Sequence, residues 1–294
     1  MRVGLIGLGK MGSAMAERLL SVGFDLGVYN RTASKCDLLV EQGAKRMSTV
    51  RDAARHGRVV VTMLENDPAL TSVAFDRAGI LEALAPGSVH VAMGTHSTGL
   101  VRKLTAAHEA VGQSFVSAPV LGRPPAARAA ELGIIVGGTS EAVELCRPVL
   151  QALARRVFEV GADPVAAAAA KIVNNLVLAC SIEAMGEGFA LGRKCGLSPQ
   201  SLFQVLTEGL FSGPAHKIYG KIIAQADYSR EPGFTAGTGM KDILLALAAA
   251  DDSAVPLPSV VICRDRLSSA IARGEEGYDW SVMALEQARA SGLM

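Results

Sequence analysis

The first turn of the chain constrains its fold most. A short apolar run, Val3–Ile6, leads directly into a G-x-G-x-x-G pattern, and a helical segment, Ser13–Val22, follows it. In this pattern the first glycine permits a tight turn, the second lets backbone approach a pyrophosphate, and the third lets the helix pack on the strand. The helix N-terminus then holds the phosphates. This context predicts a dinucleotide site formed by Gly7, Leu8, Gly9, Lys10, Met11 and Gly12.

Up to about residue 160, short apolar runs alternate with amphipathic segments. This alternation predicts an α/β Rossmann domain with a doubly wound, mainly parallel sheet. The expected strands are Val3–Ile6, Leu26–Tyr29, Val59–Met63, Val89–Met93, Ser114–Val116 and Gly133–Val136. The expected helices are Ser13–Val22, Ser34–Gln42, Thr49–Arg55, Pro68–Phe75, Thr98–Ala110 and Ser140–Leu153.

The strand pattern stops after Gly161, and an apolar segment runs from Pro164 to Lys194. A helix of about 30 residues is roughly 45 Å long, and one this apolar must be wrapped by other helices. We therefore expect a Rossmann domain over residues 1–162 and an all-α domain over residues 163–294. The glycines expected to admit a close neighbour, including a second subunit, are Gly186, Gly188 and Gly192. Shorter helices are expected at Pro199–Leu206, His216–Gln225, Gly239–Ala250 and Pro258–Arg273.

Composition excludes several classes of protein. The net charge of +1 gives no broad field for nucleic acid or an acidic membrane, so neither is expected as a partner. Five scattered cysteines, with no C-x-x-C pair, argue against a disulfide framework or a zinc site and favour a reducing cytoplasm. The apolar start is interrupted by glycines, unlike a signal peptide, and Lys171 comes too soon after Pro164 for a membrane span. A soluble, cytoplasmic protein without a metal is expected.

The end of the second expected strand selects the cofactor. NAD enzymes usually carry an acidic residue about 20 residues past the glycine loop, where it binds the ribose 2′-hydroxyl. This chain has Asn30, Arg31 and Thr32 there instead. A carboxylate would repel a 2′-phosphate, whereas Arg31 can pair with it bidentately and its two neighbours can hydrogen-bond it. The pattern predicts NADP(H).

The segments Gly4–Leu20 and Val28–Ala44 closely resemble the start of the β-hydroxyacid dehydrogenases. This family includes 3-hydroxyisobutyrate dehydrogenase and, closest in pattern, the NADPH-dependent glyoxylate/succinic semialdehyde reductases. The resemblance covers nearly the whole chain, and as a set it is specific for the superfamily but not for a substrate. It continues through Val61–Leu64, Ala118–Val120, Lys171–Asn175 and Met240–Asp242.

The resemblance implies roles for individual residues. Met63 and Leu64 would line the path from adenosine to nicotinamide, and Thr95 would contact the nicotinamide ribose. Lys241 would lie at cofactor and substrate, and Phe234 would place an aromatic ring against the substrate. The same pattern identifies Lys171 as the catalytic lysine and Asn175 as the asparagine one helical turn on.

The chemistry of the residues agrees with these roles. Lys171 and Asn175 are four positions apart and share one helix face. An ammonium in an apolar helix is costly unless it has a partner or a function. Hydride addition to a carbonyl leaves an alkoxide, and a desolvated lysine can supply its proton. Lys171 is the expected proton donor, and Asn175 would orient the reacting groups.

The chain departs from the family pattern in three places. The D-M-S-T segment is here Ala92–Thr95, which lacks a hydroxyl at Gly94, and Ala167–Ala170 replaces a glycine-rich helix entry. The expected anion clamp at the substrate consists here of Leu121, Gly122 and Arg123, with leucine where the pattern has serine. These changes predict a substrate bulkier or less anionic than glyoxylate. For Arg123 and for His96 two interpretations are equally supported. Each residue either contacts the substrate or has no role in ligand binding.

We therefore expect an NADPH-dependent reductase of a small aldehyde or keto acid, or the reverse dehydrogenase, that forms a homodimer or homotetramer. An imine reductase on the same fold is one alternative, because a G-R-P segment follows Leu121. Such enzymes normally lack the lysine that this chain keeps. A non-catalytic NADP(H)-binding protein is an alternative of another class.

Overall fold

The computed structural model describes residues 1–229 and 232–294. Its backbone contacts divide the chain into two compact units, Met1–Lys171 and Ile172–Met294. The division falls inside the long helix α9 (Pro164–Lys194), whereas the predicted domain boundary lies between residues 162 and 163, just before this helix. The reason is that the first turns of α9 belong to the first unit, where Val165 and Ala168 pack with Leu100 and Phe115.

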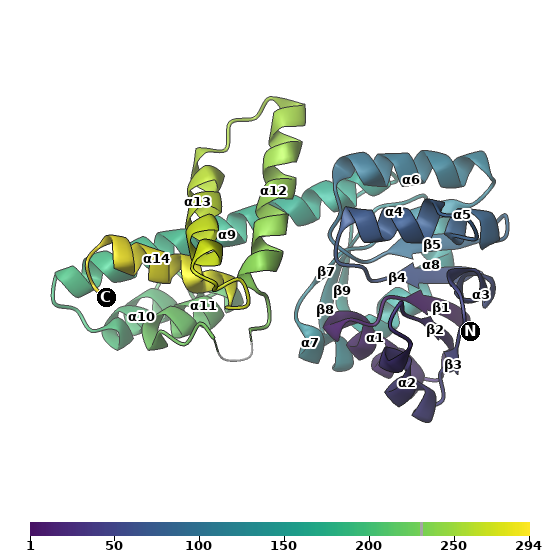
Figure 1. Ribbon diagram of the computed structural model, residues 1–294, viewed down its shortest axis with the longest axis horizontal. Coiled ribbons are helices and arrows are strands. Elements are labelled where there is room, and N and C mark those ends of the chain that lie inside the picture. The colour runs from purple at the N-terminus through teal and green to yellow at the C-terminus, as the bar shows by residue number, and fades with distance from the viewer. Residues whose placement is uncertain (230–231) are drawn as a thin grey trace. The chain divides into compact units, whose positions relative to one another are not determined.

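The first unit is built on a six-stranded sheet of order β3-β2-β1-β4-β5-β6, in which every pairing is parallel. This confirms the predicted doubly wound Rossmann architecture (Figure 1). The strands are β1 (Arg2–Ile6), β2 (Asp25–Tyr29), β3 (Lys45–Arg46), β4 (Val59–Thr62), β5 (Val89–Ala92) and β6 (Ser114–Ser117). The helices are α1 (Lys10–Ser21), α2 (Asp37–Glu41), α3 (Val50–Arg55), α4 (Asp67–Phe75), α5 (Ile80–Ala83), α6 (Thr98–Ala110), α7 (Pro124–Arg128) and α8 (Ser140–Leu153), with a 3-10 turn at Ala33–Cys36.

Along the central strands of this sheet, alternate residues face opposite layers of helices. Val59 and Val61 pack in the core that contains α1 and α8, whereas Val60 between them packs with α3 and α5. Strands covered on both faces are apolar at nearly every position, so the sequence showed them clearly. Gly4 of β1 is required by close packing, because a Cβ there would lie 2.0 Å from the carbonyl oxygen of Ala53.

A second, three-stranded sheet of order β7-β8-β9 was predicted only in part. Its strands are β7 (Val120–Leu121), β8 (Leu132–Val136) and β9 (Ala154–Glu159), and only β8 was expected. β9 carries Arg155, Arg156 and Glu159 and is largely exposed, so it lacks the apolar run that marks a buried strand. β7 is too short to leave a pattern.

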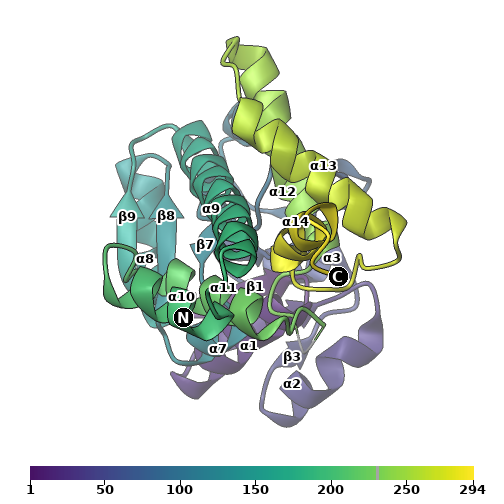
Figure 2. The ribbon, with the colours of Figure 1, turned by 90° about the vertical axis from the view of Figure 1, so that its left-hand side faces the viewer.

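The second unit contains helices only among its described residues. They are the rest of α9, α10 (Pro199–Glu208), α11 (Pro214–Gln225), α12 (Ala236–Ser253), α13 (Pro258–Ala272) and α14 (Met283–Ala290), with a 3-10 turn at Trp280–Val282. The expected helices are confirmed with small shifts at their ends, and α14 is an addition. Gly186 and Gly192 of α9 are approached closely, as expected, but by this chain itself: added Cβ atoms would lie 2.9 Å from Ala284 of α14 and from Leu202 of α10. Figures 1 and 2 both show α10 and α14 beside α9.

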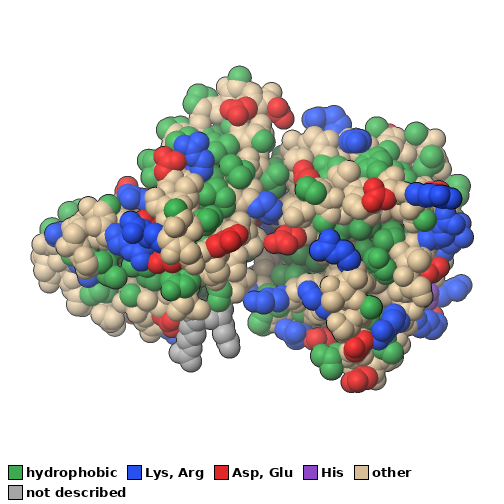
Figure 3. Space-filling view, viewed as in Figure 1, with side chains coloured by type: hydrophobic (Ala, Val, Ile, Leu, Met, Phe, Trp, Pro, Cys, Tyr) green, Lys and Arg blue, Asp and Glu red, His purple; other side chains and the backbone are tan. Residues whose placement is uncertain are grey.

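Helix α9 is long and apolar enough to cross a membrane by length and composition. One such helix is weak evidence, because the core helix of a soluble protein passes the same test. Ala179 and Ile182 of α9 are fully buried in the core of the second unit. Lys and Arg are interspersed with Asp and Glu over the face drawn in Figure 3, in keeping with the net charge of +1.

Candidate functional site

The glycine loop between β1 and α1 has the geometry of a phosphate cradle. Gly7 adopts a φ of +99°, and a Cβ there would lie 2.4 Å from the carbonyl oxygen of Met63. A Cβ at Gly12 would lie 1.9 Å from the carbonyl oxygen of Gly7, so the helix can pack on the turn only without a side chain. At Gly9 an added Cβ would meet no described atom within 4 Å. The loop is therefore closed where it packs and open where a pyrophosphate would lie, and its residues fit a dinucleotide.

The start of α1 is also suited to an anion. Gly9 is its N-cap residue and supplies no side-chain hydrogen bond, and its first turn contains no acidic residue. The N–H groups of that turn thus have no carboxylate competing for them within the turn. Oriented N–H groups and the positive end of a helix favour phosphate.

Asn30, at the end of β2, braces the glycine loop. Its Oδ1 accepts a hydrogen bond from the N–H of Leu8 at 2.9 Å, and its Nδ2 donates to the carbonyl oxygen of Thr32 at 3.0 Å. The pattern at the end of β2 predicted a 2′-phosphate contact for Asn30 but not this structural role. Arg31 and Thr32 are exposed beside it. The next acidic residue, Asp37, is ion-paired with Arg46.

The other residues predicted for the cofactor in the first unit follow β4 and β5. The N–H of Met63 donates to the carbonyl oxygen of Ile6 at 2.9 Å, which holds the end of β4 against the glycine loop. Leu64 follows directly, and Thr95 follows β5, the next strand in the sheet. Carboxyl ends of parallel strands meet at one edge, so the structure brings these residues to the edge where such sheets bind ligands.

Asp67 and His96 lie at the same edge. For His96 the sequence left substrate contact and no ligand role as equal alternatives, and for Asp67 no role was predicted. Nδ1 of His96, which is 3% exposed, lies 3.2 Å from Oδ1 of Asp67. The N–H of Ser97 donates to the same oxygen at 3.1 Å. Burial acts to raise the pKa of Asp67, but these hydrogen bonds outweigh it and hold the pKa below its ordinary value. Asp67 is thus an ionised carboxylate that joins the loop after β4 to the loop after β5.

The predicted catalytic residues lie in α9. Lys171 is 9% exposed and Asn175, one turn later, is 4% exposed. The Asn175 amide donates through Nδ2 to Oδ2 of Asp242 in α12, and its Oδ1 accepts from Nδ2 of Asn174 at 3.0 Å. The amide is therefore held in one orientation by a buried carboxylate.

Asp242 also meets Lys241, the residue predicted at the cofactor and substrate. Nζ of Lys241 lies 2.9 Å from Oδ1 of Asp242. The distance is that of an ion pair, but the angles do not meet those of a hydrogen bond. No role was predicted for Asp242. A carboxylate directly after Lys241 is visible in the sequence, but its contact with Asn175 of α9 depends on how the two helices pack.

Phe234, expected against the substrate, lies just before α12 and packs on Trp280. The two ring centroids are 4.8 Å apart at an angle of 64°, and the backbone N–H of Trp280 donates to the carbonyl oxygen of Phe234 at 3.0 Å. Trp280 is 1% exposed, so one side of Phe234 is fixed in the core of the second unit.

The expected anion clamp is held on the small sheet. Leu121 ends β7 and pairs with Gly133, and Gly122 has a φ of +141°. A Cβ at Gly122 would lie 2.7 Å from a methyl carbon of Leu132. Arg123 is the N-cap residue of α7 and is partly buried. The turn thus requires glycine at position 122. At position 121 the family pattern has serine, and Leu121 places an apolar side chain there.

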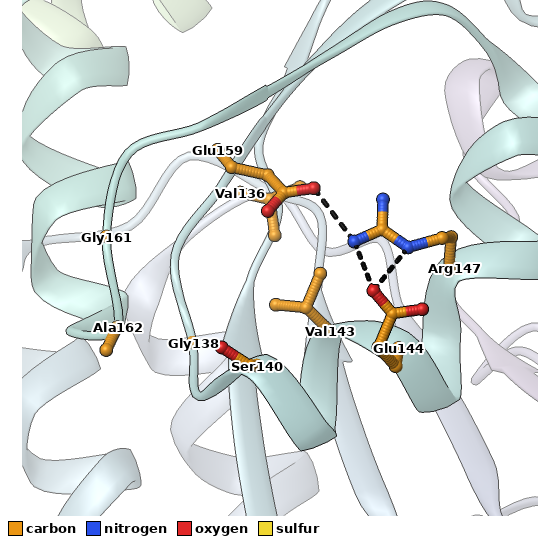
Figure 4. Close-up of a pocket in the computed structure, with 9 residues that line it drawn as sticks. All are labelled: Val136, Gly138, Ser140, Val143, Glu144, Arg147, Glu159, Gly161 and Ala162. Carbon is orange, nitrogen blue, oxygen red and sulfur yellow. Dashed lines mark hydrogen bonds and ion pairs between the residues drawn. The ribbon is translucent and has the colours of Figure 1, made fainter.

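A separate pocket of about 220 Å³ lies between β8, the start of α8 and the end of β9 (Figure 4). Within it, Arg147 lies 2.7 Å from Glu144 and 2.9 Å from Glu159. Two carboxylates on one guanidinium leave the group with a net negative charge, which does not favour an anion. None of the residues predicted for the site is among those that line this pocket.

Comparison with known proteins agrees with both units. Residues 2–161 match the family model described as the NAD binding domain of 6-phosphogluconate dehydrogenase, and residues 166–285 match that described as the NAD-binding domain of NADP-dependent 3-hydroxyisobutyrate dehydrogenase. The chain is 40% identical to the uncharacterized oxidoreductase YfjR of Bacillus subtilis, over 96% of this chain and 98% of that one. It is 32% identical to glyoxylate/succinic semialdehyde reductase 1 of Arabidopsis thaliana, over 96% of this chain and 97% of that one.

Among solved structures, 3-hydroxyisobutyrate dehydrogenase of Mycobacterium tuberculosis with L-serine superposes with a TM-score of 0.87 at 28% identity. The match covers 96% of this chain and 97% of that one. The two family models together span both units, and the relatives are matched over nearly their full length. The chain therefore belongs to the β-hydroxyacid dehydrogenase family of nicotinamide-dependent oxidoreductases.

Proposed function

We propose that the protein is an NADPH-dependent reductase of a small aldehyde or keto acid, with Lys171 as proton donor. The observation that carries this proposal is the buried Lys171, one turn from an Asn175 whose amide is fixed by Asp242. NADPH, when bound, supplies a hydride to the carbonyl carbon. Lys171 gives a proton to the carbonyl oxygen, so that an alcohol forms without a free alkoxide, and then regains a proton from water.

The chain's own residues divide the remaining work. Asn175 orients the ammonium or the substrate oxygen, and Asp242 acts through Asn175 as a positioning residue. The ion pair with Asp242 holds Lys241, which we assign to cofactor and substrate binding. A buried amide fixed at both ends loses little freedom when the substrate arrives, which favours catalysis.

The preference for NADP(H) rests on the end of β2. Arg31 is exposed there, and Asp37, the nearest following carboxylate, is held by Arg46. A guanidinium pairs with a phosphate through two parallel hydrogen bonds, and no acidic side chain takes the position that would bind a 2′-hydroxyl. Exposed Thr32 adds a hydroxyl.

The substrate we propose is bulkier or less anionic than glyoxylate. Leu121 in place of a serine, and Gly94 in place of another, remove hydroxyl groups that would hold a small carboxylate. Phe234, backed by Trp280, offers an aromatic surface to an apolar substituent. Arg123 would bind a carboxylate where the substrate has one.

We also propose a cytoplasmic homodimer or larger homo-oligomer. The five cysteines are scattered, with no C-x-x-C pair, which favours a reducing compartment. Along α9, Val173, Val177 and Leu191 are 56%, 56% and 67% exposed, and Gly188 between them leaves open space. An exposed apolar face on one long helix favours burial against a second copy.

The test is a panel of aldehydes, keto acids and cyclic imines, assayed with NADPH and with NADH. The proposal expects turnover of one or more carbonyl compounds, faster with NADPH. Turnover of cyclic imines alone would favour an imine reductase, and tight binding of NADPH without turnover would favour a non-catalytic binding protein. Loss of turnover in Lys171→Ala with NADPH affinity retained would tie the activity to the proposed proton donor.

A further inference from the structure

The contact between Asp67 and His96 joins two loops that both carry cofactor residues. Asp67 is the first residue of α4, three positions after Leu64, and His96 directly follows Thr95. We propose that this pair is a clamp that positions the nicotinamide half of the cofactor site. The inference rests on the proposed function, because it takes Leu64 and Thr95 as cofactor contacts.

Gly94 shows how closely the two loops approach. A Cβ at this position would lie 2.4 Å from the carbonyl oxygen of Leu64 and 2.6 Å from Nε2 of His96. A side chain there is thus excluded from two directions, by backbone and by an imidazole. The family pattern has serine at this position, whereas this chain has glycine with the imidazole of His96 close beside it. The imidazole and the Leu64 backbone therefore both lie against Gly94, in the loop after β5.

The polar end of the imidazole fixes its orientation. The Asp67 carboxylate accepts hydrogen bonds and donates none while ionised, so Nδ1 of His96 carries the proton that it shares with Asp67. The N–H of Ser97, the N-cap residue of α6, donates to both oxygens of Asp67, at 3.1 Å and 3.4 Å. One carboxylate therefore holds the imidazole and the start of α6 together, with Thr95 directly before them. Such charge-assisted hydrogen bonds are stronger than neutral ones.

The clamp is local to one half of the site. It links the loops after β4 and β5, whereas Arg31 follows β2, on the other side of β1 in the sheet. Loss of the clamp should weaken the binding of ligands that reach Leu64 and Thr95 and should not affect the binding of ligands held at the 2′-phosphate. A general loss of stability would weaken the binding of both kinds of ligand, so the comparison distinguishes a positioning role from a structural one.

The experiment compares NADP⁺ with 2′,5′-ADP, which keeps the adenosine and the 2′-phosphate but lacks the nicotinamide, by titration calorimetry on the full chain. His96→Ala should weaken NADP⁺ by about tenfold or more and change 2′,5′-ADP by less than about twofold. Arg31→Ala is the reciprocal control, because it should weaken both ligands alike.

Two conservative variants test the geometry itself. In His96→Asn the amide N–H can replace Nδ1 and restore NADP⁺ binding. In His96→Gln the amide matches Nε2, and binding should stay weak. If Ala does not fold, the contrast of Asn with Gln gives the same comparison. Equal NADP⁺ affinities of the wild type and the three His96 variants, or equal losses of NADP⁺ and 2′,5′-ADP binding in His96→Ala, overturn the clamp. A wild-type protein that binds neither ligand refutes the proposed function itself.

Discussion

We expect a chain of four buried side chains, from β4, β5, α6 and the segment after α6, to make the first unit sensitive to acid. The amide of Gln113 donates to the carbonyl oxygens of two residues, at 3.1 Å and 2.6 Å, so its Oε1 accepts from Nδ1 of His108 at 2.6 Å. Nε2 of His108 must then accept from Nδ1 of His90 at 3.0 Å, and Nε2 of His90 accepts from the hydroxyl of Thr62 at 3.0 Å. With both imidazoles neutral, each ring nitrogen makes one hydrogen bond, two as donors and two as acceptors. A further proton on either imidazole would require the hydroxyl of Thr62 to accept in place of donating.

The pKa values follow the same logic. Burial, followed by the neighbouring imidazoles, holds the pKa of His90 well below its ordinary value. Burial lowers the pKa of His108 from 6.5 to about 4, although the hydrogen bond to Gln113 acts to raise it. As the pH falls below 6.5 the unfolded chain takes up protons that the folded chain refuses until about pH 4, so stability is lost across that window. For His108 alone the free energy of unfolding should fall by about 2 kcal/mol between pH 7 and pH 5.

The assay is urea unfolding at pH 7 and at pH 5, followed by far-ultraviolet circular dichroism. Fluorescence of Trp280, the single tryptophan of the sequence, reports on the second unit in the same samples. The double variant His90→Val with His108→Leu removes both imidazoles and should have a smaller pH dependence, whatever its stability at pH 7. His216→Gln is the control outside the network. If the double variant loses as much stability as the wild type between the two pH values, the buried pair is not the cause.

Three further predictions concern the proposed activity and assembly. Arg31→Ala should weaken NADPH by about tenfold or more and leave NADH nearly unchanged, because a bidentate charge-assisted contact contributes on the order of 1.5–3 kcal/mol; equal losses in a binding titration would show that Arg31 supports the fold. Lys171→Ala should lower kcat by about 10²–10⁴-fold with NADPH affinity retained, and Lys171→Arg should restore little, since a guanidinium keeps its proton; near-normal turnover of both variants in steady-state assays would place the proton donor elsewhere. Light scattering over a dilution series should give at least a dimer mass, and Leu191→Glu on the exposed face of α9 should lower it; a monomer at every concentration would contradict this.

The sequence was sufficient where one local pattern determines a structure. The glycine loop and the strands around it were predicted because tight turns and buried parallel strands leave few choices of residue. β9 was missed because it is an exposed strand without an apolar run.

Contacts between residues far apart in the sequence could not be predicted from local patterns. His96 and Asp67 are 29 positions apart and meet because β4 pairs with β5. Asp242 and Asn175 are 67 positions apart and meet only once α9 and α12 have packed. Neither carboxylate has its partner nearby in the sequence, so no local pattern predicts these contacts.

The bracing of the glycine loop by Asn30 has a consequence for redesign of the cofactor preference. The familiar exchange would introduce an aspartate at the end of β2, and residue 30 is where it would go. An aspartate still accepts from the N–H of Leu8, but it loses the donor to the carbonyl oxygen of Thr32 and sets two oxygen atoms against each other. The exchange would therefore loosen the turn that carries Arg31 at the same time as it repels a phosphate. In this chain residue 30 is therefore a poor place to change the proposed nucleotide preference, because its amide also holds the phosphate loop, whereas a change at Arg31 leaves that amide in place.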